Sequence, residues 1–557
     1  MVTDCGKMAE VLNKWYCSVF TEENLTNMPT PETLYEGNEP LKSVHFTAGK
    51  VKKKLTNLKP TAAPGPDKIW ARVLHDLAEV LAEPFAMVFS SCLEEGAVPP
   101  DWKTANVTPI FKSGPKGCPG NYRPVSLTSI VCKVMESILR DAIVEFLAEH
   151  TLLRLSQHGF MKKRSTLTNL LEYLEELTNM MDMGLAMDIV YLDFSKAFDK
   201  VPVRRLLAKC EGLGIRGEVL AWITEWLTGR QQRVVINGQS STWADITSGV
   251  VQGSVLGPCL FLIYINDIDK GVENLEGFLS KFADDSKWAR KVMGEEDREE
   301  FQKGLDNLMK WAEDWQMEFN KGKCHIMHLG RANQRYEYTM GGTPLDSSEY
   351  EKDLGVLINQ SLRPSMQCAK AAKKGNMVLG QLMRGIGYRD KKVFVDLYKT
   401  YVRPHLEYCV QAWSPWTIGD KDILEAVQKR AVKAVSNLRS QTYEDRLLEL
   451  GLDSLEERRK RGDLLMAYRV FSGEDNVDPS TWVTPAIGPG ALTRRQDGYQ
   501  NVIVPQWNGE IRRNFWSVRV CDPWNDLPDS VKMVESMDSF KNSVDNLRGW
   551  GRQPNRQ

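Results

Sequence analysis

Residues 278–285 read Phe-Leu-Ser-Lys-Phe-Ala-Asp-Asp, and this stretch decides the interpretation of the chain. A β-like run leads into the adjacent acids Asp284 and Asp285, and residues 286–290 fit the return arm of a hairpin, which puts the acid pair at its turn. Two abutting carboxylates repel each other and lose hydration when they are brought together. A bound cation is the natural compensation.

A third acid, Asp193, ends another β-like run, residues 190–192. Mg²⁺ prefers oxygen ligands, so three carboxylates on two strands favour a two-metal centre for phosphoryl transfer. Its metals would lie roughly 3.5–4 Å apart, which requires ligands that converge from different strands. We expect Asp193 and Asp284 to bridge the metals, Asp285 to lie beside them, and the backbone carbonyl of Phe194 to complete one shell. An isolated Asp-Asp pair is more often simple turn chemistry, so further motifs must decide.

The bulk composition describes an ordinary globular chain. Its 557 residues predict three to four domains, and 42% of them are hydrophobic, which is enough for sizeable cores. The net charge of −1 argues neither for nor against nucleic acid. The charge distribution is more informative, because residues 361–440 hold 15 Lys and Arg against 6 Asp and Glu. A basic zone on a neutral chain fits a phosphate-binding groove.

Several classes of protein are disfavoured by the sequence. The 11 cysteines form no Cys-x-x-Cys pair, so neither a zinc ribbon nor a disulfide framework is indicated. The N-terminus lacks the pattern of a signal peptide. The longest apolar run, Val255–Ile265, is too short to span a bilayer. We therefore expect no membrane partner and a location in the nucleus, the cytoplasm or both.

Six blocks of sequence, and the order in which they occur, carry more information than the acid pair alone. Residues 191–201 read YLDFSKAFDKV, residues 248–258 read SGVVQGSVLGP, and residues 282–285 read FADD. They resemble motifs A, B and C of the reverse transcriptases of non-LTR, LINE-like retrotransposons of the jockey/CR1 type. Three upstream blocks resemble the finger motifs of that family in the same order: PGPD at 64–67, NYRPVSL at 121–127 and QHGF at 157–160.

The resemblance implies a fold of the α/β (α+β) class. It would be a right-hand polymerase with fingers, an antiparallel-sheet palm and a helical thumb, followed by a helical and loop-rich C-terminal region. The boundaries that we expect are a leader or linker with one helix at 1–48, an N-terminal finger extension at 49–93, fingers and palm at 94–357, a helical thumb or connection at 358–475, and a C-terminal tail region at 476–557.

The activity that the resemblance implies is RNA-directed DNA polymerisation. Two metals, Mg²⁺ or Mn²⁺, would activate a primer 3′-hydroxyl and hold the dNTP triphosphate. The partners would be an RNA template and a DNA primer or target, in target-primed reverse transcription. The resemblance also assigns roles to individual residues: Asp193, Asp284 and Asp285 catalytic, Phe198 a steric gate under the sugar, Gln252 and Gly253 in the nucleotide pocket, and Lys112 and Arg123 on the triphosphate.

The sequence departs from the family pattern at a few places. Val251 stands where proline is usual and Ser286 where threonine is common, but no catalytic group is lost. The family's endonuclease would precede residue 1, so we expect a chain that cannot nick its own target. An alternative function is that of an inactive or co-opted RNA-binding remnant. The oligomeric state and the template specificity stay open.

Overall fold

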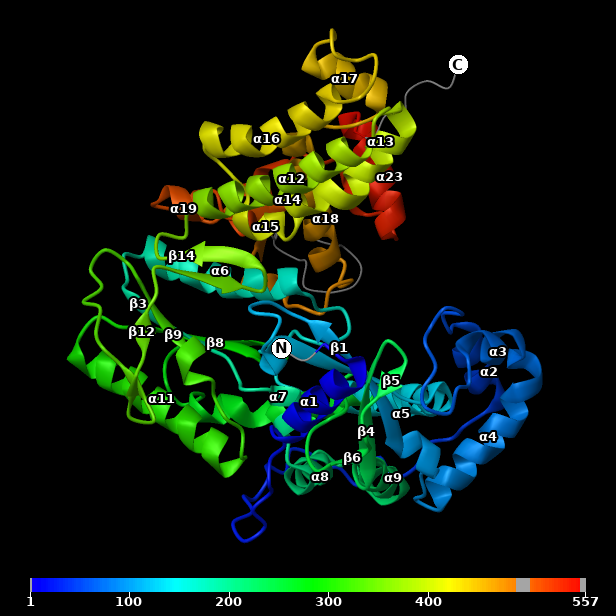
Figure 1. Cartoon of the computed structure of the whole chain (residues 1–557). Coiled ribbons are helices and arrows are strands. Elements are labelled where there is room, and N and C mark those ends of the chain that lie inside the picture. Colours follow the sequence, from blue (N-terminus) through cyan, green and yellow to red (C-terminus); the bar gives the residue numbers. More distant parts are fainter. Residues whose placement is uncertain (1–2, 487–500, 551–557) are drawn as a thin grey trace.

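The structure is a computed structural model that describes residues 3–486 and 501–550. Figure 1 shows a sheet with its helices at the lower left, a group of N-terminal helices at the right, and a helical region above them. This arrangement of sheet and helices confirms the predicted α/β fold class. Among the described residues, no helix is both long and apolar enough to cross a lipid bilayer.

The sheet at the left has the strand order β12-β9-β3-β8-β7. Its centre is β3 (Met187–Leu192), which pairs antiparallel with β8 (Asp285–Lys291) and with β9 (His325–Leu329). At one edge β7 (Phe278–Phe282) pairs antiparallel with β8. At the other edge the short β12 (Asp346–Ser347) pairs parallel with β9, so the expected antiparallel palm sheet has one short parallel edge.

Helices cover both faces of this sheet (Figure 1). On one face Tyr173 of α6 (Thr166–Asp182) packs edge-on against Phe278. On the other face Phe301 of α11 (Glu295–Asp314) stacks on Trp288, with ring centroids 4.7 Å apart. A strand buried on both sides needs an apolar sequence, and the run Ile-Val-Tyr-Leu in β3 supplies one.

A second sheet lies beside the N-terminal helices. Its strands are β1 (Thr104–Phe111), β2 (Tyr122–Leu127), β4 (Arg230–Ile236), β5 (Gln239–Ser240) and β6 (Ala244–Ile246). β1 and β2 form an antiparallel hairpin, whereas β1 and β4 run parallel. Helix α1 (Cys5–Cys17) packs on this sheet and buries Tyr16 together with Val107 and Val234.

The N-terminal helices differ in one respect from the prediction. The turn-forming residues 62–67 predict that a single helix follows over residues 69–81, but the chain forms α3 (Ala71–Asp76) and α4 (Ala78–Glu94) with a break at Leu77. Residues 46–58 have helical spacing with their lysines on one face, and the helix predicted there is α2 (Ala48–Thr56). Three of its lysines are exposed, whereas Lys54 is half-buried and pairs with Asp141.

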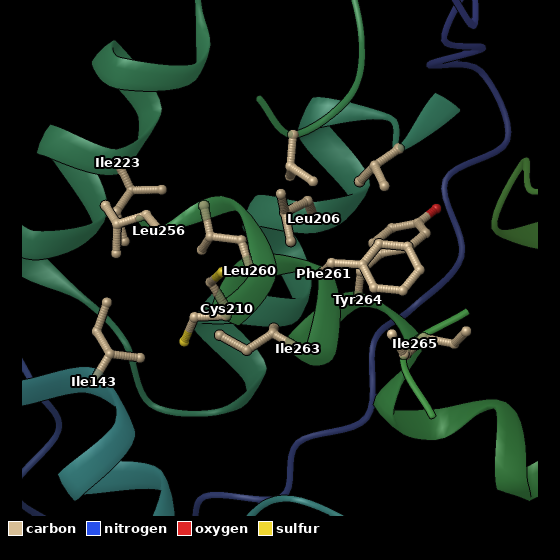
Figure 2. Packing of buried hydrophobic residues seen from close by; sticks show 14 of the residues in the cluster. Ile143, Leu206, Cys210, Ile223, Leu256, Leu260, Phe261, Ile263, Tyr264 and Ile265 are labelled. Carbon is tan, nitrogen blue, oxygen red and sulfur yellow. The ribbon is translucent and has the colours of Figure 1, made fainter. Parts of the chain in front are cut away.

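The main core surrounds α10 (Gly257–Ile265), which is apolar on all sides and buried along almost its whole length. Figure 2 shows its residues packed against side chains from the neighbouring helices, which are α5 (Ile130–Glu149), α8 (Val203–Gly212) and α9 (Gly217–Leu227). A helix without a polar face is stable only when it is enclosed. The loop that precedes α10 is therefore anchored to the most rigid part of the molecule.

The chain beyond the hairpin of β13 (Tyr350–Asp353) and β14 (Val356–Asn359) is mostly helical, as expected. The first group of helices comprises α12 (Ser365–Gly385), α13 (Lys391–Leu397), α14 (Arg403–Glu407), α15 (Val410–Trp413), α16 (Ile418–Lys433), α17 (Tyr443–Leu450) and α18 (Leu455–Phe471). The second group comprises α19 (Glu510–Arg513), α20 (Trp516–Arg519), α21 (Cys521–Asn525), α22 (Asp529–Lys532) and α23 (Met537–Arg548).

A buried ion pair joins this C-terminal group to the palm. Arg512 of α19 lies 2.5 Å from Glu175 of α6, and both side chains are almost completely buried. Ser517 donates a second hydrogen bond to the same carboxylate, at 2.6 Å. The last helices are thus part of the folded body.

Candidate active site

The acid pair lies at a two-residue hairpin turn. Strands β7 and β8 pair through Phe282 and Asp285, which leaves Ala283 and Asp284 as the turn. Ala283 has a positive φ of 58°, the left-handed conformation that tight hairpins require at such a position. The predicted hairpin is therefore present, but only Asp284 of the acid pair lies in its turn, because Asp285 begins β8.

Asp193 reaches the same end of the sheet. It follows β3 directly, and Leu192 pairs with Ser286, so Asp193 continues the strand that lies next to Asp285. Desolvation and the like charge of Asp193 raise the pKa of Asp284. Desolvation, followed by the like charges of Asp284 and Asp193, raises the pKa of Asp285 to about 6. The three carboxylates thus form one electrostatically coupled group.

This group fits a hard divalent cation by its donor chemistry. It offers three carboxylates, together with the Phe194 carbonyl, which accepts no hydrogen bond from any described residue. The Lys323 ammonium lies 3.0 Å from Asp193 and supplies positive charge at the site. In the described parts of the chain, no three His, Cys, Asp or Glu side chains are placed so that they could together hold a metal ion. The metal roles of these residues stay predictions.

The QHGF loop holds the hairpin turn in place. The Gln157 side-chain oxygen accepts hydrogen bonds from the backbone N–H of Ala283 at 2.9 Å and of Gly159 at 2.8 Å. The backbone N–H of His158 donates to the Lys281 carbonyl at 2.9 Å. A Cβ on Gly159 would lie 2.3 Å from the Ala283 nitrogen, so only glycine allows this close approach. The loop was predicted as a finger motif, and its contact with the acid turn was not foreseen.

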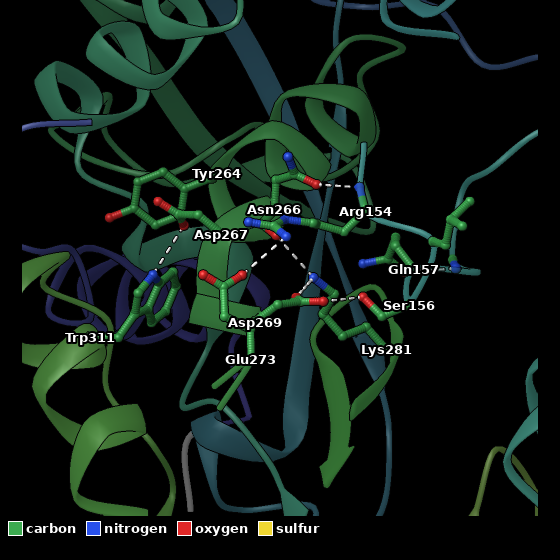
Figure 3. Close-up of polar contacts among 12 residues, drawn as sticks. Arg154, Ser156, Gln157, Tyr264, Asn266, Asp267, Asp269, Glu273, Lys281 and Trp311 are labelled. Carbon is green, nitrogen blue, oxygen red and sulfur yellow. Dashed lines mark hydrogen bonds and ion pairs between the residues drawn. The ribbon is translucent and has the colours of Figure 1, made fainter. Parts of the chain in front are cut away.

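A buried polar network holds the end of β7 that leads into the turn (Figure 3). The Lys281 ammonium is fully buried, forms an ion pair with Asp269 and donates to the Asn266 carbonyl at 3.1 Å. Ser156 donates to the same Asp269 carboxylate at 2.5 Å. Because one strand of the turn is held by charged hydrogen bonds, Asp284 is carried on a rigid support.

The segment at residues 248–258, which resembles motif B, begins with a loop that contacts β2. Gln252 accepts a backbone hydrogen bond from Ser126 at 2.8 Å. Gly253 has a φ of 110°, and a Cβ there would meet the Ser126 carbonyl oxygen at 2.5 Å. The Gln252 side chain donates to Asp199 at 2.8 Å. Burial raises the pKa of Asp199. Sequence reasoning missed Asp199 as the partner that orients Gln252.

Glu136 fixes the other end of this loop. One carboxylate oxygen accepts from the backbone N–H groups of Val255 at 2.7 Å and Leu256 at 3.2 Å. The other oxygen accepts from the Trp226 indole at 3.2 Å. Glu136 is completely buried, and its carboxylate binds the two backbone N–H groups that directly precede α10.

Phe198 lies in an aromatic stack. Its ring is nearly parallel to that of Phe261 on α10, with centroids 4.4 Å apart and an interplanar angle of 12°. Phe261 is fully buried, so one face of Phe198 rests on the main core. The gate role of Phe198 stays a prediction, but the ring is held in a fixed position.

Lys112 and Arg123 come from the β1–β2 hairpin. Arg123 pairs with Ile110 across it, and the backbone N–H of Lys112 donates to the Asn121 carbonyl at 2.9 Å. Among the described residues neither side chain forms an ion pair. Both charges nevertheless act on the acid turn, because they lower the pKa of Asp284 against the effect of desolvation. Two cations without an ion-pair partner among the described residues therefore lie close enough to act on the Asp284 carboxylate.

Comparison with known proteins agrees with this geometry. Residues 110–368 match the family described as "Reverse transcriptase (RNA-dependent DNA polymerase)". The chain contains a reverse transcriptase domain. The matched range of this domain includes β3, the acid turn and the loop before α10, and it confirms the resemblance that the motif order indicated.

The reverse transcriptase domain has relatives among mobile elements. The RNA-directed DNA polymerase from mobile element jockey of Drosophila funebris is 25% identical over 401 residues, which is 70% of this chain and 44% of the relative. The jockey protein of Drosophila melanogaster is 24% identical, covering 73% and 45%. The probable RNA-directed DNA polymerase from transposon X-element of the same species is 25% identical, covering 67% and 42%. The chain thus spans less than half the length of these relatives.

Among solved structures, apo telomerase from Candida tropicalis, truncated from its C-terminal domain, aligns with 50% of this chain and 59% of its own length. The sequence identity is 12% and the TM-score is 0.34. That score is too low to bear on the fold.

Proposed function

We propose that this chain is an RNA-directed DNA polymerase that adds dNTPs to a primer 3′-hydroxyl on an RNA template. The observation that carries the proposal is the coupled carboxylate group of Asp193, Asp284 and Asp285, on which the nearby cations Lys112 and Arg123 act. Carboxylates that bind divalent cations and basic side chains that bind a triphosphate are the two halves of a nucleotidyl-transfer site.

Each residue has a definite task in this proposal. The three carboxylates and the Phe194 carbonyl would hold Mg²⁺ or Mn²⁺, and the bound metal would supply the Lewis acidity that activates the attacking hydroxyl and the positive charge that offsets the triphosphate. Arg123 offers a planar fork of donors to phosphate oxygens, whereas Lys112 offers a point charge. Further tasks belong to the loop before α10, where Gln252 and Gly253 line the nucleotide pocket.

The domain division belongs to the same proposal. Residues 94–357 act as fingers and palm, after a leader at 1–48 and a finger extension at 49–93. The helices within 358–475 act as the thumb, and 476–557 as a C-terminal region. The surplus of Lys and Arg at 361–440 supports contacts between the thumb and the phosphates of an RNA–DNA hybrid. The process in which the polymerase would act is target-primed reverse transcription.

Primer extension tests the proposal directly. The purified chain is given oligo(dT) annealed to poly(rA), dTTP and Mg²⁺ or Mn²⁺, and extension products are resolved by length. We expect template-dependent extension that disappears when the RNA is digested beforehand. A folded protein that binds the hybrid but extends nothing would contradict the proposal and favour an RNA-binding remnant.

The gate assignment gives a prediction about sugar selectivity. Replacing Phe198 by valine should raise incorporation of UTP relative to dTTP by at least about tenfold, because the smaller side chain leaves room for a 2′-hydroxyl. Single-nucleotide insertion opposite rA measures the ratio of kcat/KM values. Selectivity that stays at the wild-type value would refute the gate role, provided that dTTP insertion is retained.

The acid turn gives a prediction about pH. Asp285 has a pKa of about 6, so it gains a proton as the pH falls through that value, and protons and metal compete for the same oxygens. We expect the extension rate to fall as the pH drops through about 6, with a midpoint that moves to lower pH when Mg²⁺ is raised. Initial rates from pH 5 to 8 at two Mg²⁺ concentrations measure this. A midpoint independent of Mg²⁺ would argue against carboxylate ligands.

A further inference from the structure

Phe160 combines two unusual properties. Its φ is 56°, in the left-handed region that a bulky aromatic residue rarely adopts. Its side chain is also 57% exposed, although aromatic rings of this size are usually buried. Neither property benefits the free protein, because one strains the backbone and the other leaves apolar surface in water. Strained and exposed residues of this kind gather at ligand sites.

The surroundings of Phe160 place it between two parts of the active site. Its neighbour Gly159 lies against the backbone of Phe282 and Ala283, directly before the acid turn. Its ring packs edge-on against Phe198, with centroids 6.2 Å apart and an interplanar angle of 72°. Phe160 therefore bridges the space between the carboxylates and the residue proposed to lie under the sugar.

The loop around Phe160 is fixed on both sides, which explains how the strain persists. Before it, Gln157 is tied to the acid turn by its side chain. After it, Arg164 donates to the Gln157 carbonyl at 3.1 Å and to the Asn476 carbonyl at 2.9 Å. A strained residue survives only where its surroundings determine its conformation in this way.

The contacts of Phe198 show which ring is available to a ligand. One face of Phe198 stacks on Phe261. Phe261 is completely buried, so a ligand cannot reach it. The contact with Phe160 is on the solvent side. A nucleotide that enters the space beside Phe198 therefore meets the open surface of Phe160 as well.

We propose that Phe160 is a specificity-determining residue, which forms with Phe198 a two-ring wall for the sugar of the incoming nucleotide. The edge contact of Phe160 holds the Phe198 ring against the sugar, and its open surface packs on the same sugar. This inference rests on the proposed polymerase function and adds to it a second residue that selects deoxyribose.

The test compares Phe160→Gly, Phe160→Tyr and a control, Thr151→Gly, in single-nucleotide insertion of dTTP and UTP and in thermal unfolding. Thr151 is exposed, has a φ of 52° and follows the end of α5, so glycine there relieves similar strain away from the nucleotide site. We expect Phe160→Gly to lower the preference for dTTP roughly threefold to tenfold, as the loss of one aromatic contact predicts, without lowering Tm.

The other variants separate a selective role from a structural one. Phe160→Tyr keeps the ring and should keep the wild-type preference for dTTP. Thr151→Gly should hold or raise Tm and leave the preference unchanged. The inference is overturned if the wild-type chain extends primers and Phe160→Gly leaves the preference intact, or if that variant loses Tm as a core residue would. A wild-type chain that extends nothing overturns the polymerase function, and this inference with it.

Discussion

Replacing Asp284 by asparagine is expected to lower primer extension by about a thousandfold or more, with no loss of folding stability. A metal-binding carboxylate supplies several kcal/mol of charge stabilisation in the transition state, and each 1.36 kcal/mol is a factor of ten in rate. The amide is nearly the same size and keeps the hairpin turn. This variant should therefore lose primer extension but keep its fold.

The retained or increased folding stability of Asp284→Asn is expected from the sign of the pKa shift of Asp284. The pKa of Asp284 is raised in the folded protein, so its ionised form is less favourable there than in the unfolded chain. Above that pKa the negative charge destabilises the fold, and a neutral amide removes the cost. In the absence of metal, Tm at pH 7.5 should be equal to or above the wild-type value.

A matched control for Asp284 is Asp346→Asn on β12, an exposed aspartate of the same sheet. It should change neither the extension rate nor Tm. If Asp284→Asn retains extension within tenfold of wild type, the carboxylate group is not the metal-binding centre and the proposed function loses its main support.

Replacing Glu136 by glutamine is expected to loosen the loop before α10. The carboxylate accepts two backbone N–H groups of that loop and an indole N–H while completely buried. An amide group turned toward these donors would leave at least one of them without an acceptor. Hydrogen bonds to a buried charge contribute about 1.5–3 kcal/mol each, so we expect a local loss of about 3 kcal/mol.

Hydrogen exchange measures this effect where it occurs. The amides of Val255 and Leu256 should exchange roughly a hundredfold faster in Glu136→Gln, since 1.4 kcal/mol corresponds to a factor of ten. Primer extension should fall as well, because Gln252 and Gly253 belong to the same loop. Glu145→Gln, an exposed residue of the same helix α5, is the control and should change neither readout. Unchanged exchange at the two amides would show that Glu136 does not hold the loop.

The sequence was sufficient for the parts of the site that local pattern determines. The β-like run before Asp284 and the polar run after Asp285 predicted a hairpin, and the structure has one. The apolar run before Asp193 likewise predicted a strand, although β3 ends at Leu192, one residue before the acid. A turn and a strand are set by residues close together in the chain, so a single sequence can reveal them.

The supporting residues could not be predicted, because their partners are remote in the chain. Gln157 binds a turn 126 residues away, Glu136 binds a loop 119 residues away, and Asp199 binds Gln252 across 53 residues. Only tertiary packing brings these pairs together. Glu136 did leave a signal, since it is the one acid in the mainly apolar stretch 130–139 of α5, which also holds Lys133. A lone acid on the buried face of a helix needs a partner.

The ends of helices were a second feature that could not be predicted from the sequence. Nothing in the local pattern shows the break at Leu77, where α3 gives way to α4. The pattern of residues 293–319 predicts one long helix, but α11 ends at Asp314. Trp311 and Trp315 lie four residues apart in that pattern, which predicts a packing role, and both are buried. Propensity changes gradually along a sequence, whereas capping and packing end a helix at one residue.

The ion pair between Glu175 and Arg512 sets the minimum length of chain that biochemistry should use. The segment that carries the family signature, residues 110–368, includes Glu175 but stops far short of Arg512. Expressed alone, it would keep a buried carboxylate whose cation had been removed, at a cost of about 3–5 kcal/mol. The matched segment is therefore expected to be less stable when it is expressed alone, and enzymology on this protein should use a chain that includes Arg512.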